Sequence, residues 1–125
     1  MTDSPFYYGL CSQRVTIYRK QGDTVLRQVV ENCYLSRQEE FVTDVLGTRQ
    51  GVEFRLIIPG NRQQIHLGDR VYDGIGPEIS AAEWKDFLPA TVPGLVQVSY
   101  VRPCVWEGEI CHVEAGHRQT ARPQL

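Results

Sequence analysis

Apolar and polar side chains alternate between residues 52 and 58, which is the clearest hydrophobic pattern in the chain. One face of this run holds Val52, Phe54, Leu56 and Ile58, and the other holds Glu53, Arg55 and Ile57. A period of two residues predicts a β-strand that buries one face. Pro59-Gly60 ends the run, and Ile65–Tyr72 is predicted as the next strand, kinked at Gly68-Asp69, where the aspartate can bond nearby amides.

The amino-terminal half of the chain predicts two further strands. Arg14–Lys20 is rich in β-branched and aromatic residues and is followed by turn residues. Thr24–Leu35 is predicted as the partner strand, and its Val29-Val30 doublet indicates a bulge or a strand covered on both faces. The inward residues expected in this second strand are Val25, Val29, Cys33 and Leu35. Residues 36–51 contain polar and turn residues and are interpreted as a projecting hairpin or a long loop.

One short helix is predicted around residue 83. Ser80 and Glu83 have the spacing of a capping box, and Ile79 and Trp84 have the spacing of the hydrophobic staple that accompanies it. Pro89 is expected to end the helix. The side chains expected to share its apolar face are Trp84, Phe87 and Leu88. The helix should therefore pack as a lid on the sheet or plug one end of a barrel.

The carboxyl-terminal third returns to the strand pattern. Leu95–Val105 alternates, and Pro103 within it indicates a sheet edge or a bulge because proline has no backbone donor. Glu107-Gly108 predicts a turn into a last strand over residues 109–113. We therefore expect one mainly β domain over residues 1–125, a small antiparallel β-barrel or sandwich of about six or seven strands with one short helix. Its ordered core should span about residues 14–116, followed by a frayed tail over 117–125.

Composition narrows the function classes. The chain has 125 residues, 42% of them hydrophobic and 22% charged, and a net charge of −2. This balance predicts a soluble globular protein without a general affinity for nucleic acid or membrane. The start of the chain lacks a secretory pattern, so we expect a cytosolic protein with reduced cysteines. Arginine outnumbers lysine, which occurs only at Lys20 and Lys85, and arginine suits bidentate contacts at protein interfaces.

Candidate chemistry is sparse. Cys104, Cys111, His112 and His117 lie close in sequence, but six residues separate the cysteines and no CxxC pair is present. The cysteines, with Cys11 and Cys33, are expected to fill small core positions instead. His66 is expected to face solvent or an interface. We predict no metal site and no cofactor.

Catalytic residues are also not expected. The acidic residues considered for acid/base chemistry are Glu39, Glu40, Asp69, Asp73 and Glu78, and surface charge explains them more simply. The chain has no nucleophile motif. Gly74–Pro77 is interpreted as a tight turn because it lacks the lysine and hydroxyl residues of a phosphate loop. The protein is therefore predicted not to be an enzyme.

A nucleic-acid-binding barrel is the alternative interpretation, because small β-barrels commonly bind single strands on aromatic side chains. The tyrosines available are Tyr7, Tyr8, Tyr18, Tyr34, Tyr72 and Tyr100. They are not interleaved with a dense basic cluster, and the net charge is negative. Salt-dependent binding to oligonucleotides would distinguish this alternative.

An ordered series of short motifs spans about residues 14–116. In chain order it consists of Val15-Thr16-Ile17-Tyr18, Cys33-Tyr34, Arg55-Leu56-Ile57-Ile58-Pro59, Ile65-x-x-Gly68-Asp69-Arg70-Val71-x-x-Gly74, Trp84, a late valine-rich strand and His112-Val113-Glu114. The series resembles small minor-capsid or head–tail joining proteins of tailed phages and prophages of Gram-positive bacteria. Tyr34 departs from the tryptophan expected on the second strand.

The resemblance implies a non-enzymatic role in virion morphogenesis. The expected unit is a structural subunit that forms a homo-oligomeric ring at the portal–tail junction. Its implied partners are copies of itself and the portal, connector and tail proteins, with no membrane and no small-molecule substrate, and with DNA met only in passing through a channel. The implied location is the bacterial cytoplasm during assembly and then the virion. No catalytic, cofactor or metal residues are carried over.

Overall fold

Seven strands and one short helix make up the described part of the computed structural model, which covers residues 8–44, 47–61 and 64–117. The strands are β1 (Gln13–Gln21), β2 (Thr24–Asp44), β3 (Gly47–Pro59), β4 (Arg70–Asp73), β5 (Leu95–Gln97), β6 (Tyr100–Trp106) and β7 (Glu109–His117), and the helix is η1 (Ala81–Asp86). The mainly β class with one short helix is therefore confirmed. The start of the chain and the predicted tail beyond His117 lie outside the described residues.

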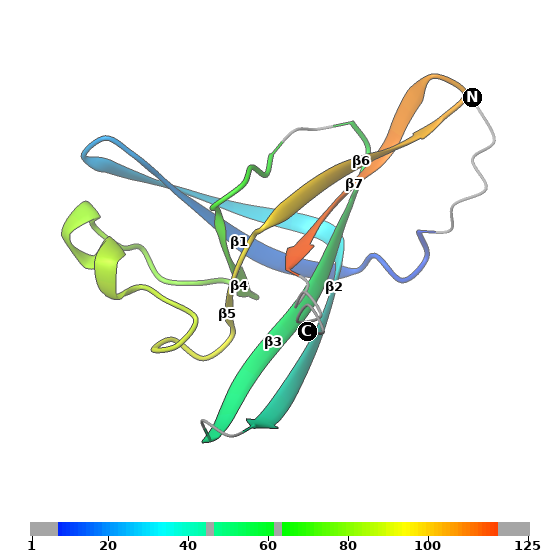
Figure 1. Cartoon of the computed structure of the whole chain (residues 1–125). Helices are drawn as coiled ribbons and strands as arrows, with labels where there is room; N and C mark the ends of the chain where they lie inside the picture. The colour runs from blue at the N-terminus through cyan, green and yellow to red at the C-terminus, as the bar shows by residue number, and fades with distance from the viewer. Residues whose placement is uncertain (1–7, 45–46, 62–63, 118–125) are drawn as a thin grey trace.

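The strands form one antiparallel sheet in the order β5-β4-β1-β2-β3-β7-β6 (Figure 1). The long strand β2 belongs to both halves of the sheet, because its first part pairs with β1 and its second part pairs with β3. Between the pairs Val15↔Val30 and Gln13↔Cys33, β2 contains one extra residue, and Asn32 has a positive φ of 56°. This bulge bends β2 and turns the second half of the sheet relative to the first.

The bulge corrects part of the sequence prediction. It lies at Glu31-Asn32, next to the Val29-Val30 doublet that predicted it. Val30 is buried in the inner core, whereas Val29, expected to point inward, is exposed. The extra residue reverses the alternation. Even-numbered side chains of β2 point inward on one side of the bulge, and odd-numbered side chains point inward on the other.

The two end strands of the sheet are consecutive in sequence. Residue Val98, which follows β5, donates its N–H to the carbonyl oxygen of Asp69 (2.8 Å), and Ser99 donates to that of Gly116 (2.8 Å). The predicted single strand over residues 95–105 is therefore two strands. They are separated by a corner between β5, which pairs with β4, and β6, which pairs with β7. The sheet curls into a half-barrel whose ends approach each other at this corner. Pro103 lies in β6, an end strand, as expected for an edge position.

The inner core fills the concave face of the curled sheet. On β3 the predicted alternation is confirmed: Phe54, Leu56 and Ile58 are buried and Arg55 is exposed. The buried members of this core are Val15, Ile17, Val30, Cys33, Leu35, Phe54, Leu56, Ile58, Ile65, Val71, Val96, Val98, Val113 and Ala115.

A second, smaller core lies on the opposite face of β1 and β4, under the segment that carries η1. Tyr18, Phe87 and Leu95 are its buried members. The partly buried side chains around them are Val25, Tyr72, Ile79, Trp84 and Val92. Of the two places predicted for the helix, the lid on the sheet is the one observed.

The capping box of η1 is also confirmed, because Ser80 Oγ accepts from Glu83 N and Glu83 Oε1 accepts from Ser80 N. The helix is of the 3₁₀ type and ends at Asp86, before Pro89.

The loop before β4 differs from the prediction. The strand expected over Ile65–Tyr72 begins only at Arg70. Gly68 has a φ of +85°, and the buried Asp69 carboxylate accepts the N–H of His66 (2.9 Å). A positive φ and a side chain that occupies a backbone donor both interrupt a ladder, so Gly68-Asp69 forms a corner, as expected, but the residues before it are not a strand.

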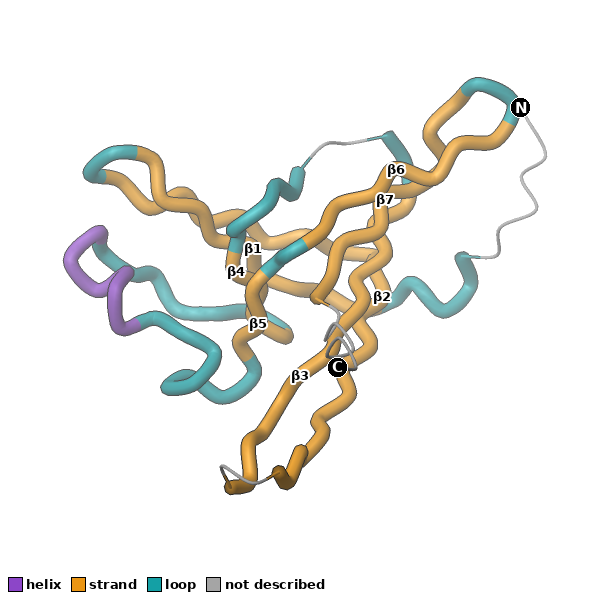
Figure 2. The backbone as a smooth tube through the Cα atoms, viewed as in Figure 1, coloured by secondary structure: helices purple, strands orange, loops and turns teal. Residues whose placement is uncertain are grey.

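Three hairpins extend from the sheet (Figure 2). β1 and β2 meet at Gly22-Asp23, and β6 and β7 meet at Glu107-Gly108, where both residues have positive φ. β2 and β3 stay paired out to Asp44↔Gly47. Residues 36–51 therefore belong to a projecting hairpin and not to a loop, although residues 45–46 lie outside the description.

Candidate interaction surfaces

The Gly68-Asp69 corner is closed by a charged cluster. Arg19 Nε lies 2.9 Å from Asp69 Oδ1, and Arg19 Nη2 lies 3.0 Å from Oδ2. Arg19 Nη2 also contacts Nδ1 of the exposed His66. The hydrogen bond with Asp69 raises the pKa of Arg19. Because Asp69 is 1% exposed and both its oxygens are engaged, this cluster fixes the corner to β1. The sequence did not reveal Arg19 as the partner.

Gly74–Pro77 attaches the lid segment to β1. Thr16 Oγ1 donates to the Gly74 carbonyl (2.8 Å) and accepts from Gly76 N (2.8 Å). Tyr18 Oη donates to the Pro77 carbonyl (2.6 Å). The segment is therefore a strap held by side chains of β1. Of the other predicted acids, Asp73 and Glu78 are exposed, and the side chains of Glu39 and Glu40 lie outside the description.

The cysteine and histidine residues near the carboxyl end do not converge. Cys104 faces His112 across the β6–β7 ladder, and Cys111 is the extra residue of a bulge in β7. His117 Nδ1 lies 3.0 Å from Ser99 Oγ at the far end of the strand. Within residues 8–44, 47–61 and 64–117, no three His, Cys, Asp or Glu side chains are grouped as metal ligands.

The cysteines fill core positions less often than expected. Only Cys33 is fully buried, and Cys11, Cys104 and Cys111 are partly exposed. Burial raises the pKa of the Cys33 thiol to about 11. The group is therefore a neutral core side chain near pH 7 and not a nucleophile.

The outer face of β3, β7 and β6 carries tyrosine and arginine side chains around a buried carboxylate. Tyr100 Oη donates to Glu114 Oε2 (3.0 Å), and Arg102 Nη2 lies 3.2 Å from the same atom. Arg55 is exposed and stands opposite Gly116 of β7. We call this surface the arginine face and define it as Tyr34, Arg55, Ile57, Tyr100, Arg102 and Glu114. Arginine and tyrosine are enriched at protein interfaces.

His112 extends the same outer face toward the amino-terminal segment. Its Nδ1 lies 2.8 Å from Tyr8 Oη, and the two rings meet edge to face with centroids 5.5 Å apart. Burial lowers the pKa of His112, Glu114 opposes that shift, and Arg102 adds to it. Tyr8 thus ties the described start of the chain to β7.

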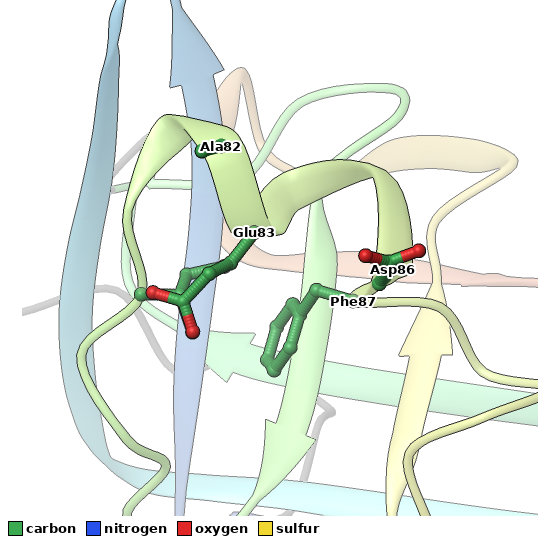
Figure 3. Close-up of a pocket in the computed structure, with 5 residues that line it drawn as sticks. Ala82, Glu83, Asp86 and Phe87 are labelled. Atoms are coloured by element: carbon green, nitrogen blue, oxygen red, sulfur yellow. The ribbon is translucent and has the colours of Figure 1, made fainter.

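A shallow hollow of about 300 Å³ lies beside η1 (Figure 3). We call it the helix notch; its lining residues are Ile79, Ala82, Glu83, Asp86 and Phe87. The Phe87 ring lies between the carboxylates of Glu83 and Asp86 in this view. Apolar walls with acidic rims suit a cationic side chain that has an aliphatic stem.

The β6–β7 hairpin ends in an apolar tip. Val105 is 56% exposed and Trp106 is 38% exposed, directly before the Glu107-Gly108 turn. Two successive positive φ values make this turn a tight one that keeps the strands in register. A tryptophan held outward on such a hairpin is a common interface anchor.

Comparisons of the chain with models of protein families, with curated proteins and with solved structures found no match. Among the described residues, no helix has both the length and the apolar content needed to cross a bilayer. The function is therefore inferred from the surfaces and from the resemblance in the sequence.

Proposed function

We propose that the protein is a structural subunit of a phage or prophage virion that assembles as a homo-oligomeric ring at the portal–tail junction. The observation that supports it most is the arginine face, where Arg55, Tyr100 and Arg102 lie on an outer sheet surface that the lid does not cover. A ring subunit needs such a surface on a rigid scaffold, because each copy must contact two neighbours. The role requires no catalytic group.

The three hairpins fit this role. They project away from the rest of the sheet (Figure 1), and the β6–β7 hairpin carries the exposed Trp106 next to its turn. Projecting loops and hairpins of a rigid scaffold are where contacts with other components are usually made. The ordered series of motifs that resembles head–tail joining proteins supports the same assignment.

Deletion of the gene from an inducible prophage tests the proposal. We expect filled heads and free tails in the lysate, with joined particles restored by a plasmid copy of the gene. The gene should also lie next to genes for portal, capsid and tail proteins. Normal joined particles after deletion would reject the proposal.

A nucleic-acid-binding module is the second candidate, and the arginine face is also the observation in its favour. Tyr34 and Tyr100 are half-buried on a curled sheet beside Arg55 and Arg102, an arrangement that suits base stacking with phosphate contacts. Fluorescence anisotropy with labelled single-stranded oligonucleotides tests it. Binding at 50 mM salt that falls steeply by 300 mM and is weakened by Arg55→Ala would support it. No binding at 50 mM salt would remove it.

A further inference from the structure

The helix notch carries negative charge that the described residues leave unneutralised. The Asp86 carboxylate makes no hydrogen bond or ion pair with another described residue. Glu83 uses Oε1 to accept from Ser80 N (3.0 Å), and hydrogen bonds with Ser80 lower its pKa, so it stays ionised near neutral pH. The Phe87 ring supplies an apolar wall between the two acids (Figure 3).

The arginine face carries the opposite charge. Arg55 is exposed and forms no hydrogen bond or ion pair with another part of the described chain. Its neighbours in register are Ser36 on β2 and Gly116 on β7, and the Tyr100 ring of β6 lies over Gly116. The half-buried Ile57 lies two positions along the same face. Among the described residues Arg55 is therefore an exposed cation without a charged partner, next to Ile57.

The two surfaces lie on different halves of the curled sheet. The notch belongs to the lid over β1 and β4, whereas Arg55 lies on β3, in the half formed with β7 and β6. η1 and β6–β7 are on opposite sides of the molecule in Figure 1. A contact between unlike surfaces of identical chains is head-to-tail, and it closes into a ring when the rotation between copies permits.

We propose that Arg55 of one copy enters the helix notch of a second copy, with its guanidinium between Glu83 and Asp86 and its stem on Phe87. The inference rests on the proposed function and names the contact that builds its ring. The hollow of about 300 Å³ accommodates a guanidinium and part of its stem. Opposite charges at close range set both the partner and the register of such a contact.

Charge reversal tests the contact on the full chain. Sedimentation velocity from 10 µM to 1 mM at 50 mM salt should show association of the wild type that weakens at 300 mM salt. Asp86→Arg and Arg55→Asp should each weaken the association by about tenfold or more. Asp23→Arg and Arg14→Asp make the same charge changes at exposed positions outside both surfaces and should leave it unchanged.

Mixing the two variants gives the most specific result. In an equimolar mixture of Asp86→Arg and Arg55→Asp, the unchanged Arg55 of the first variant can enter the unchanged notch of the second, so association should exceed that of either variant alone. Circular dichroism of each variant checks that the fold is intact. A monomeric wild type at 1 mM, equal losses in the two controls, or a mixture that stays monomeric would overturn the contact.

The outcome separates this contact from the proposed function. If the charge reversals leave association unchanged while gene deletion still yields unjoined heads and tails, the contact is wrong and the morphogenesis role stands. If deletion leaves joined particles, the role is wrong whatever the variants do. If the variants still associate and instead lose binding to the purified portal ring, the notch or the arginine face serves the portal, and the self-contact is overturned.

Discussion

β1 and β3 are both central strands of the sheet, yet they bury their side chains differently. In β1 four consecutive residues, Val15–Tyr18, are buried, because the inner core covers one face and the lid covers the other. In β3 burial alternates, with Leu56 inside and Arg55 outside. A continuous buried run marks a strand covered on both faces, and alternating burial marks a strand covered on one face.

The difference divides the molecule into a closed side and an open side. On the closed side, β1 side chains hold the lid through Tyr18 and Thr16, so polar groups are used internally. On the open side, polar side chains of β3 and β6 face outward, and Arg55 is left unpaired among the described residues. Substitutions of the side chains that hold the lid to β1 should therefore change stability, and substitution of the exposed Arg55 should change association.

The largest loss of stability should come from a substitution in the inner core, to which both halves of the sheet contribute. Leu56 is fully buried on β3, so Leu56→Ala should lower the free energy of unfolding by about 3 kcal/mol through lost transfer energy and a cavity. Leu26→Ala makes the same chemical change at a side chain that is 44% exposed and should cost less than about 1 kcal/mol. Urea denaturation measures both. Equal losses would mean that the inner core is not where β3 gains its stability.

Alanine substitutions at two glycines compare how tightly the open side and the closed side are packed. At Gly116 a Cβ atom would collide with the Phe54 carbonyl oxygen and the Tyr100 ring, and at Gly76 it would collide with the Tyr18 hydroxyl. Backbone cannot move aside as a side chain can, so Gly116→Ala should cost about 2–3 kcal/mol and Gly76→Ala about 1–2 kcal/mol. Thermal unfolding ranks them. The reverse order would show that the lid is more rigidly held than β3 and β7.

The local parts of this fold could be predicted from the sequence. Alternation identified β3 with Leu56 inward, and the Ser80–Glu83 spacing identified the cap of η1. These features depend on neighbours along the chain. The Gly68-Asp69 corner was recognised, but its φ of +85° and the Asp69 bond to His66 N remove the strand predicted before it.

The long-range parts could not be predicted, because nothing in the local pattern encodes them. Arg19 meets Asp69 across 50 residues, and Arg55 and the helix notch belong to elements that the sheet topology places apart. The strand expected over 95–105 breaks because Val98 bonds to Asp69, just before β4, whereas Ser99 bonds to Gly116 of β7. The arginine face therefore had no sequence signal beyond the excess of arginine over lysine and an alternation that puts Arg55 outward.

Arg70 gives a smaller effect, confined to the closed side. Its Nη1 donates to the carbonyls of Trp84 and Phe87 (2.7 Å to Phe87), and the guanidinium carbon lies 3.8 Å from the centroid of the Trp84 ring. Arg70→Lys replaces the planar fork by a point charge and should cost about 1 kcal/mol. Hydrogen exchange should quicken for amides of η1 and not for those of β3. Lys85→Ala, an exposed change on η1, is the control; uniform acceleration would contradict a lid-specific role.

The smallest effect is a pH dependence on the open side. Burial holds the pKa of His112 below its ordinary value of 6.5, with Glu114 opposing the shift and Arg102 and the contacting Tyr8 also facing the ring. The unfolded chain then binds the proton more tightly than the folded one. The stability that depends on neutral His112 is therefore complete above about pH 6.5 and is lost as the pH falls through the lower folded pKa.

Comparing the wild type with His112→Gln isolates this contribution, because the other titrating carboxyl groups are common to both. Between pH 7.5 and pH 5 the wild type should lose more unfolding free energy than the variant, by less than about 1 kcal/mol. Urea midpoints at the two pH values measure it. Identical pH dependence would mean that His112 titrates alike in both states, and that the open side is more hydrated around β7 than its burial indicates.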